Sequence, residues 1–382
     1  MHDPSSVNAN LIPTLGAAID ARAELFDVRH ETAFRLFNGF YEGFPQVVAD
    51  LYGRTLVLHN YASPPLDAAD LVNAAARFYL ERLPWINTIL IKARHAESYD
   101  EKLGVIVHGE TLDQQVIENG VRYAVDLRIN QDTSLYLDTR NLRVWAKENL
   151  NGKTVLNTFA YTGSLGVAAK AGGATRVMQV DLSRSFLNVA KDSYVRNGFA
   201  INKADFVTGD FWPKISHLKR DNTRFDCVFL DPPLFSTTRH GKVDLVESSH
   251  RLLNKVRPLI ADGGYLVTVN NALFVSGTAF MQTLDTLCAD GYLSVETLIP
   301  VPQDYIGYSA VAPAALPSDP APFNHATKIA VLKVRRKDAM AEFAGSPPQP
   351  CSRVPKAHPI VATAPEGEGV RLGRGVHINP NL

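Results

Sequence analysis

The sequence predicts an α/β protein, in which a doubly wound, mostly parallel sheet follows a smaller N-terminal α+β domain. A strand, a tight turn with two glycines and a helix of small residues follow one another in 155-VLNTFAYTGSLGVAAKAGG-173. From about residue 129 apolar strands alternate with helical segments, whereas the residues before it lack this alternation. Strands separated by helices build a parallel sheet with helices on both faces, and such sheets bind ligands beyond the carboxyl ends of their strands.

Three segments are expected on these grounds. Residues 1–128 form the accessory domain, and residues 129–338 form the doubly wound domain. Residues 339–382 form a flexible C-terminal extension, because the stretches SPPQP, APEGEG and RLGRG contain too few clustered apolar residues to build a core.

The accessory domain begins with an amphipathic helix and then turns to strands. Its expected elements are a helix at 11–25, strands within 32–61 broken at Gly39, Gly43 and Gly53, a helix at 67–83, a strand at 86–94, and a hairpin within 116–127 that turns at Asn119-Gly120.

The second domain is expected to run from a helix at 139–150 to a final strand at 327–336. Between them we expect strands at 154–160, 176–182, 204–210, 226–233 and 265–271, with helices between them that include 185–198 and a long one at 246–264, and then a further helix, another strand and a Pro-rich loop at 311–323.

Composition limits the protein class. The chain has 382 residues, 46% hydrophobic and 20% charged, which is ordinary for a water-soluble protein of two domains. Lys plus Arg equals Asp plus Glu at 39 each, so a polyanionic partner must be bound by a local patch. No apolar run approaches the roughly 20 residues of a membrane span, and MHDPSSVNAN has no signal-peptide core, so we expect a cytoplasmic protein with no membrane partner.

The cysteines argue against a metal or disulfide framework. Cys227, Cys288 and Cys351 form no CxxC pair, and no other residues have metal-ligand spacing, so no metal is expected. Cys227 lies inside the strand FDCVFL, where a small buried hydrophobe is the expected role.

The turn after the first strand does not match either phosphate-binding motif. A G-x-G-x-x-G fingerprint would place Tyr161 at its first glycine, and no Gly-Lys-Ser/Thr follows to form a P-loop. The alternatives are a structural strand-to-helix turn, or a turn for a ligand without a pyrophosphate, to which Gly163 would allow close backbone approach.

The next two strand ends supply carboxylates. Asp181 lies eighteen residues after Gly163, where a carboxylate can accept hydrogen bonds from both hydroxyls of a ribose, as NAD and S-adenosylmethionine both require. Asp210 and Phe211 offer an acceptor for an exocyclic amine and an apolar wall for a purine. The alternative for Asp210 is an ordinary surface or helix-capping residue.

The fourth strand end, 229-FLDPPLFS-236, is the most specific. Two prolines remove two backbone donors and fix φ, so the loop presents its carbonyls and the Asp231 carboxylate in a stiff geometry. That arrangement suits an amino or ring N–H group, with Phe235 as a stacking face for a base. A plain proline turn at a strand end is the alternative.

These motifs carry a family resemblance. Together with 131-QDTSLYLDTRNLR-143, the set VLNTFAYTGSLG, VDLS, VTGDFW, FLDPPLFS and LVTVNN resembles the bacterial 23S rRNA large-subunit methyltransferases, both a cytosine-C5 enzyme and the guanine-N7 half of a bifunctional one. The resemblance covers about residues 15–335, including the α+β domain.

The resemblance implies a class I methyltransferase fold, S-adenosylmethionine as cofactor and RNA, most plausibly 23S rRNA, as substrate and partner. It implies that the cofactor is bound by Asn157, Phe159, Tyr161, Thr162, Gly163, Asp181, Leu182, Asp210, Phe211 and Asp231, with Tyr136, Asp138 and Arg140 closing the pocket.

Two departures from the family pattern matter. Too few residues precede TAFRLFNG to hold the RNA-binding PUA domain of many members, so RNA affinity would rest on the front domain and on the basic segment Lys333–Lys337, which is equally well a solvated strand end. The C5 enzyme resembles a Ser-Cys-Ser where this chain has Val269-Asn270-Asn271, so a covalent cysteine intermediate is not expected.

The Asn-Asn pair instead resembles the guanine-N7 branch, in which a ring nitrogen needs little beyond orientation. Asp231 and the Pro232 carbonyl would then position the substrate, Asn270 or Asn271 would bond the base edge, and Phe235 would stack. Methylation of an exocyclic amine stays open, and so does a role for His325 in lining the cleft. Other possibilities are a methyltransferase of a small molecule or protein, a non-catalytic RNA-binding factor, and a homodimer.

Overall fold

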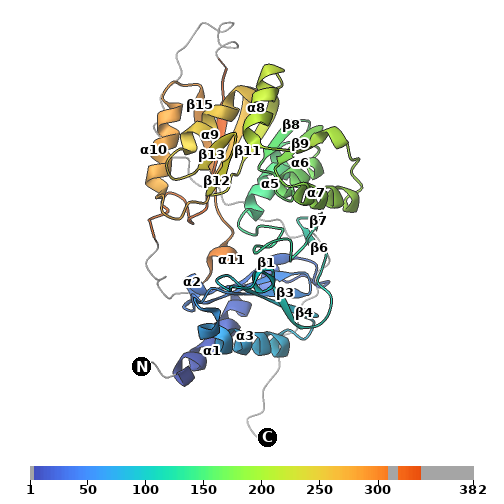
Figure 1. The fold of residues 1–382 in the computed structure, drawn as a ribbon, viewed down its shortest axis with the longest axis vertical. Coiled ribbons are helices and arrows are strands. Elements are labelled where there is room, and N and C mark those ends of the chain that lie inside the picture. Colours follow the sequence, from blue (N-terminus) through green and yellow to red (C-terminus); the bar gives the residue numbers. More distant parts are fainter. Residues whose placement is uncertain (1–3, 309–316, 337–382) are drawn as a thin grey trace.

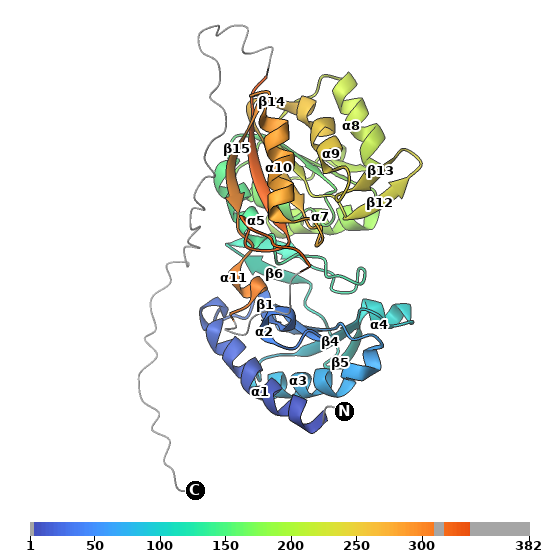
Figure 2. The same ribbon diagram turned by 90° about the vertical axis from the view of Figure 1, so that its left-hand side faces the viewer.

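A computed structural model describes residues 4–308 and 317–336. Two sheets dominate it: a five-stranded sheet near the N-terminus and a seven-stranded sheet that contains most of the remaining chain (Figures 1 and 2). The expected extension at 339–382 lies outside the described residues, as do residues 309–316 of the Pro-rich loop.

The first sheet has the strand order β1-β2-β3-β4-β5, with helices α1 and α3 on one of its faces (Figure 2). Its elements are α1 Pro4–Ala21, β1 Ala33–Asn38, α2 Gly39–Glu42, β2 Val47–Tyr52, β3 Thr55–Asn60, α3 Ala69–Arg82, β4 Thr88–Ala93, α4 Tyr99–Leu103 and β5 Val105–His108. The expectation that this part lacks strand–helix–strand units is wrong at one place, because β3 and β4 pair in parallel and α3 connects them. The apolar runs of both strands are buried, which favours such a covered parallel pair.

The hairpin predicted at Asn119-Gly120 is present, as β6 Gln115–Glu118 and β7 Val121–Ala124. Both turn residues have positive φ, 51° and 76°, as the twist of a two-residue hairpin requires. The hairpin lies beside helix α7, Arg184–Arg196, of the second sheet: the Oγ of Ser193 on this helix accepts a hydrogen bond from the backbone N–H of Ala124 at 2.9 Å. A division of the chain at residue 128 stays a prediction.

The second sheet has the order β10-β9-β8-β11-β14-β16-β15, and only β16 runs antiparallel to its neighbours. Its strands are β8 Thr154–Thr158, β9 Arg176–Asp181, β10 Phe206–Thr208, β11 Phe225–Leu230, β14 Ile260–Asn270, β15 Leu293–Ile299 and β16 Lys328–Val334. The chain order reverses between β8 and β11, so the carboxyl ends of these two strands form the crevice in which doubly wound sheets bind ligands.

Helices cover both faces of this sheet and bury two apolar cores. They are α5 Arg140–Asn149, α6 Ser164–Ala171 and α7 Arg184–Arg196 on one side, and α8 Phe211–Arg220, α9 Ser249–Val256 and α10 Gly277–Cys288 on the other (Figure 1). The doubly wound fold is therefore confirmed.

Two local predictions were wrong or incomplete. The helix expected at 246–264 spans only Ser249–Val256, and β14 begins at Ile260, because Pro258 lacks the backbone donor that a continuing helix requires. After the Asp-Pro-Pro sequence the chain also forms an unpredicted hairpin, β12 Phe235–Thr238 and β13 Gly241–Asp244.

A short helix, α11 Gln303–Ile306, joins the two sheets through Asp304, whose side chain is buried (Figure 2). The Asp304 carboxylate accepts hydrogen bonds from the guanidinium of Arg140 on α5 and from the backbone N–H of Arg35 on β1. The Asp304 carbonyl accepts another from Arg22 at 2.9 Å, and Arg22 forms a buried ion pair with Glu42. Buried charges are retained only where they are paired in this way, so α11 joins the two parts at one place.

Asp304→Ala is expected to lower the free energy of unfolding by about 3–5 kcal/mol, because it leaves the partly buried Arg140 without its acidic partner. Urea unfolding measures the change. Asp20→Ala, which removes an exposed partner of Arg82, is the matched control and should cost less than about 1 kcal/mol. Equal effects of the two substitutions would contradict the role given to α11.

Candidate cofactor and substrate site

The carboxyl ends of β8, β9 and β11 bring together the first turn, Asp181 and Asp231. The turn after β8 contains two non-glycine residues of positive φ, Phe159 at 53° and Tyr161 at 50°. Such conformations cost about 1–3 kcal/mol each and persist where the surrounding structure requires them. Here the Tyr161 backbone N–H donates to the Asp181 carboxylate at 2.8 Å, so the ends of β8 and β9 are joined directly.

Asp181 is partly buried, and each of its oxygens accepts one backbone hydrogen bond at 2.8 Å, from Tyr161 and from Ser183. Burial raises the pKa of this carboxyl, against the opposing effect of these hydrogen bonds. Each oxygen keeps a lone pair for a ligand. Leu182, the next residue, is 66% exposed and offers an apolar surface beside the carboxylate.

Gly163 begins helix α6 with φ 74°. A Cβ atom there would come within 2.5 Å of the Ala190 Cβ and 2.8 Å of the Gln179 side chain. The glycine therefore allows helices α6 and α7 and strand β9 to pack closely. Close approach of a ligand to the Gly163 backbone stays a prediction.

Asn157 and Thr162 lie beneath the turn and are buried. The Asn157 side-chain amide donates to the Gln179 Oε1 at 3.0 Å, and the Thr162 hydroxyl donates to the Ser134 carbonyl. In this structure both residues support the turn from below.

The segment 131–143 lies against the first turn. The Tyr161 hydroxyl donates to the Thr133 carbonyl at 3.1 Å, and the rings of Tyr161 and Tyr136 are 5.1 Å apart. Asp138 accepts a hydrogen bond from the Thr327 hydroxyl at 2.9 Å. The Arg140 guanidinium does not contact the first turn in this way, because it pairs with Asp304.

Asp210 and Phe211 both contact other parts of the chain. Asp210 caps helix α8: its Oδ1 accepts the Trp212 backbone N–H at 2.8 Å, so the helix-capping alternative describes the contact. Phe211 is buried and its ring stacks on Phe159 with centroids 4.6 Å apart. This ring is packed in the core, and its role as an apolar wall for a purine stays a prediction.

Asp231 follows β11 directly and is partly buried. Among the described residues its carboxyl has no hydrogen-bond partner, and Asp138 is close enough to repel its charge. Burial, followed by this repulsion, raises the pKa of Asp231 to about 7. Perturbed carboxyls in a crevice are typical of functional sites.

The rest of the Asp-Pro-Pro loop passes from the interior to the surface. Pro232 is buried, and Phe235, the first residue of β12, is 57% exposed. The Phe235 ring is therefore available for stacking, with the Lys242 ammonium 5.1 Å from its centroid.

The Asn270 side chain is hydrogen-bonded to backbone groups. It is buried, its Oδ1 accepts the Ala272 backbone N–H at 3.0 Å, and its amide donates to the Leu245 carbonyl at 3.5 Å. These bonds fix the turn after β14. The buried Oδ1 of the neighbouring Asn271, by contrast, has no partner among the described residues. Of the pair, only Asn271 keeps a free acceptor.

Burial shifts the pKa of two other candidate side chains, Cys227 and His325. Cys227 is buried inside β11, and burial raises the pKa of its thiol. Burial also lowers the pKa of His325 to about 4, and its Nδ1 accepts the Thr327 N–H at 3.0 Å. Within residues 4–308 and 317–336, no cluster has the makeup of a metal site and no helix is long and apolar enough to cross a bilayer.

The basic segment at the end of β16 lies at the end of the sheet opposite to the candidate site. Lys328 pairs with Asn270 at the carboxyl end of β14, so Lys333, which pairs with Tyr265, lies at the opposite end. The Lys333 ammonium lies 3.9 Å from the Tyr265 ring centroid. The solvated-strand-end alternative therefore describes the residues up to Arg336, and Lys337 is outside the described residues.

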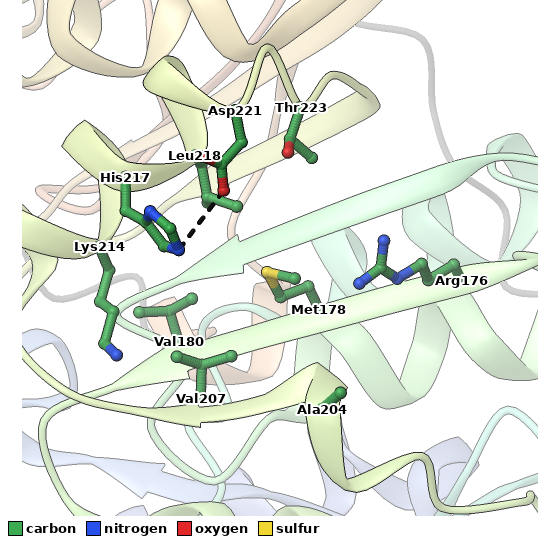
Figure 3. A pocket seen from close by; sticks show the side chains of 10 residues that line it. All are labelled: Arg176, Met178, Val180, Ala204, Val207, Lys214, His217, Leu218, Asp221 and Thr223. Carbon is green, nitrogen blue, oxygen red and sulfur yellow. Dashed lines mark ion pairs between the residues drawn. The ribbon is translucent and has the colours of Figure 1, made fainter.

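Two pockets flank β9 and β10. One, of about 530 Å³, opens at their carboxyl ends and is lined by Leu182, Thr208, Gly209, Asp210, Pro213, Lys214, Thr238, Arg239 and His240. We call it the strand-end pocket. The other, of about 380 Å³, lies between the strands and α8, and the His217–Asp221 ion pair is at its side (Figure 3). None of the predicted site residues lines this second pocket.

A seven-stranded, mostly parallel sheet with a crevice of this kind defines a methyltransferase-like fold, and known proteins agree. The solved structure of SMU.776 in complex with SAH superimposes with a TM-score of 0.75 and 22% identity, over 86% of this chain and 82% of that one. A second solved structure, of a protein from Streptococcus mutans described as a putative S-adenosylmethionine-dependent methyltransferase, superimposes with a TM-score of 0.72 and 21% identity, over 86% of this chain and 81% of that one.

Sequence comparison identifies the family. The S-adenosylmethionine-dependent methyltransferase family matches residues 89–315. Ribosomal RNA large subunit methyltransferase I of Aeromonas hydrophila is 30% identical over 282 residues, 73% of this chain and 71% of that protein. YwbD of Bacillus subtilis, named a putative ribosomal RNA large subunit methyltransferase, is 33% identical over 270 residues, which are 69% of this chain and 67% of that protein. The chain belongs to the S-adenosylmethionine-dependent methyltransferases, in the family that contains these large-subunit enzymes.

Some site residues escaped the sequence analysis. Gln179 supports the first turn through Asn157, and it could have been noticed as the one uncharged polar residue inside the apolar strand RVMQVDL. The hairpin β12–β13, which contributes Thr238, Arg239 and His240 to the strand-end pocket, has only a short Arg-His-Gly turn as its signal.

Asp231→Asn is expected to flatten the pH dependence of stability. The folded chain, with a pKa of about 7, binds this proton more tightly than the unfolded chain, whose Asp pKa is about 3.9. The stabilisation of the folded wild type by this bound proton is complete below pH 4 and is lost as pH rises through 7. At pH 8 the variant should be more stable than the wild type by roughly 2–4 kcal/mol in urea unfolding.

Asp221→Asn, at an exposed pair with His217, is the control and should shift the curve by less than about 0.5 kcal/mol. An Asp231 variant with the wild-type pH profile would contradict the raised pKa.

Proposed function

We propose that this protein transfers a methyl group from S-adenosylmethionine to a base of ribosomal RNA of the large subunit, without a covalent cysteine intermediate. The observation that carries the proposal is the Asp231 carboxyl, which has no hydrogen-bond partner in the described part of the chain, lies near Asp138 and adjoins the first turn, in a chain of this methyltransferase family. A carboxyl in this position can hold a base by its N–H groups within reach of a donor bound at the turn.

The residues present fit the cofactor. Asp181 has lone pairs for two ribose hydroxyls, Leu182 offers an apolar face to the adenine, and the strand-end pocket adjoins both. Tyr136 and Tyr161 would enclose the remainder. Asn157, Thr162, Gly163 and Phe211 would act by supporting the turn. When bound, S-adenosylmethionine supplies an electrophilic methyl group on a sulfonium.

RNA is the substrate class that the relatives favour. The Aeromonas enzymes that resemble this chain are named ribosomal RNA large subunit methyltransferase I. Of the RNA in that subunit, 23S rRNA is by far the larger molecule and offers most of the bases. The N-terminal sheet domain would bind the RNA, and the reaction would take place in the cytoplasm, where ribosomes assemble.

The enzyme would act by orienting the base against the methyl donor, without a covalent intermediate. The described cysteines, Cys227 and Cys288, are both buried, and Cys227 is held inside β11. A ring nitrogen such as guanine N7 has a free lone pair and needs only alignment with the methyl group. An exocyclic amine is the second candidate, since the ionised Asp231 could accept its hydrogen bond.

Asp231, the Pro232 carbonyl and Asn271 would orient the base, and Phe235 would stack on it. Asn271 replaces Asn270 in this role, because the Asn270 side chain bonds to the backbone of its own turn. The pKa of about 7 predicts that the free enzyme gains activity as pH rises through 7, when Asp231 becomes an acceptor.

The deciding experiment is a mass-spectrometric map of rRNA nucleosides from cells with and without the gene. One methylated 23S nucleoside should be absent from the mutant and restored by the purified protein with S-adenosylmethionine. Identical maps, together with no methyl transfer to any RNA, would refute the proposal. Methyl transfer to a small molecule or protein would identify the alternative.

Asp181→Ala is expected to weaken S-adenosylhomocysteine binding about 30- to 100-fold in calorimetry, because two charge-assisted hydrogen bonds to the ribose are lost. Since Asp181 also bonds two backbone N–H groups, urea unfolding checks that the variant is folded. Asp192→Ala, at an exposed position on α7, is the control. Wild-type affinity in the Asp181 variant would exclude it from the site.

A variant in which Cys227, Cys288 and Cys351 are all replaced by alanine is expected to keep the wild-type rate of methyl transfer, because no thiolate takes part. RNA containing 5-fluorocytosine should form no stable covalent complex with the wild type. Loss of turnover in a variant that still binds S-adenosylhomocysteine would contradict the non-covalent mechanism.

A further inference from the structure

The strand-end pocket has a cationic rim. Lys214 on α8 and Arg239 and His240 at the tip of the β12–β13 hairpin line it. Asp210 is the only acid in the lining, and one of its oxygens already caps α8. Neither Lys214 nor Arg239 has an acidic partner among the described residues, and the Arg239 side chain instead donates to the His240 Nε2 at 3.0 Å.

Close packing holds the hairpin in place over α8. A Cβ atom at Gly241 would lie 2.5 Å from the Trp212 indole, so the hairpin rests directly on the first turn of this helix. Gly241 pairs with Thr238 across the turn, and Arg239 and His240 are the two residues between them. The positions of Arg239 and His240 beside Lys214 are therefore set by backbone packing.

The cofactor does not account for these charges. The adenosine part of S-adenosylmethionine carries no phosphate, and its carboxylate is at the opposite end of the molecule from the adenine. With the adenine beside Leu182, the Lys214 ammonium and the Arg239 guanidinium at the rim face no anion of the cofactor. Unpaired cations around a nucleoside pocket instead suit a phosphate from a second molecule.

The same hairpin presents an aromatic ring. Phe235 begins β12, is 57% exposed and has the Lys242 ammonium above it. A ring for a base together with cations for the backbone is the combination with which proteins bind single-stranded nucleic acid.

We propose that the β12–β13 hairpin and the start of α8 form a phosphate-binding site for a single-stranded segment of the substrate RNA. Lys214 and Arg239 bind a backbone phosphate at the rim of the strand-end pocket, and a neighbouring base stacks on Phe235. The RNA thereby crosses the mouth of the cofactor pocket. This inference rests on the proposed function and adds to it the path of the RNA strand.

The test measures binding of protein-free 23S rRNA as a function of salt for the full chain. For a single strand, each cation on a phosphate adds about 0.7 to the slope of log K against log salt concentration. The double variant Lys214→Gln, Arg239→Gln should therefore lose about 1.4 from the slope. Its S-adenosylhomocysteine affinity should equal that of the wild type, which also shows that it is folded.

The control variant removes two positive charges as well, but at the opposite ends of the strands. Lys153 precedes β8 and Arg335 follows β16, so Lys153→Gln, Arg335→Gln should leave the slope at its wild-type value. Equal slopes for the test and control variants would overturn the proposal, and so would a loss of S-adenosylhomocysteine affinity in the test variant, because it would assign the cations to the cofactor. A wild type that binds no 23S rRNA would refute the proposed function itself.

Discussion

The buried carboxylate of Asp304 connects the two sheets of this molecule. It accepts hydrogen bonds from Arg140 of the methyltransferase sheet and from the β1 backbone of the N-terminal sheet, while its own carbonyl holds Arg22. Paired charges in a buried position are costly to separate, so the N-terminal sheet is held at one place relative to the crevice. The proposed path of the RNA depends on this arrangement, because a substrate base must reach Asp231 while its strand contacts both parts.

Electrostatics separates the roles of the two main carboxyls. Asp181 is tied to two backbone N–H groups and shapes the turn, whereas Asp231 has no described partner and lies near Asp138. A carboxyl in such surroundings holds its proton to about pH 7, and an N–H donor from a base would favour its ionised form. Affinity for the base and ionisation of Asp231 are therefore linked, which suits a site that orients its substrate rather than attacks it.

The β12–β13 hairpin extends the site on the cofactor side. Because Gly241 allows it to rest on Trp212, the hairpin lies where the ends of β9 and β10 open, and its tip adds positive charge to a chain with no net charge. A local cationic patch of this kind can attract a polyanion without a global field.

The sequence by itself determined the doubly wound fold, the family and the strand ends at which the site lies, because glycines, prolines and acids at such ends are local signals. Which side chains face the crevice was decided by the tertiary structure. Asn270 bonds to its own turn, Phe211 packs against Phe159, and Arg140 pairs with a residue 164 positions away. These contacts depend on residues that are distant in sequence or on the path of the backbone after the strand. A strand-end motif contains neither kind of information.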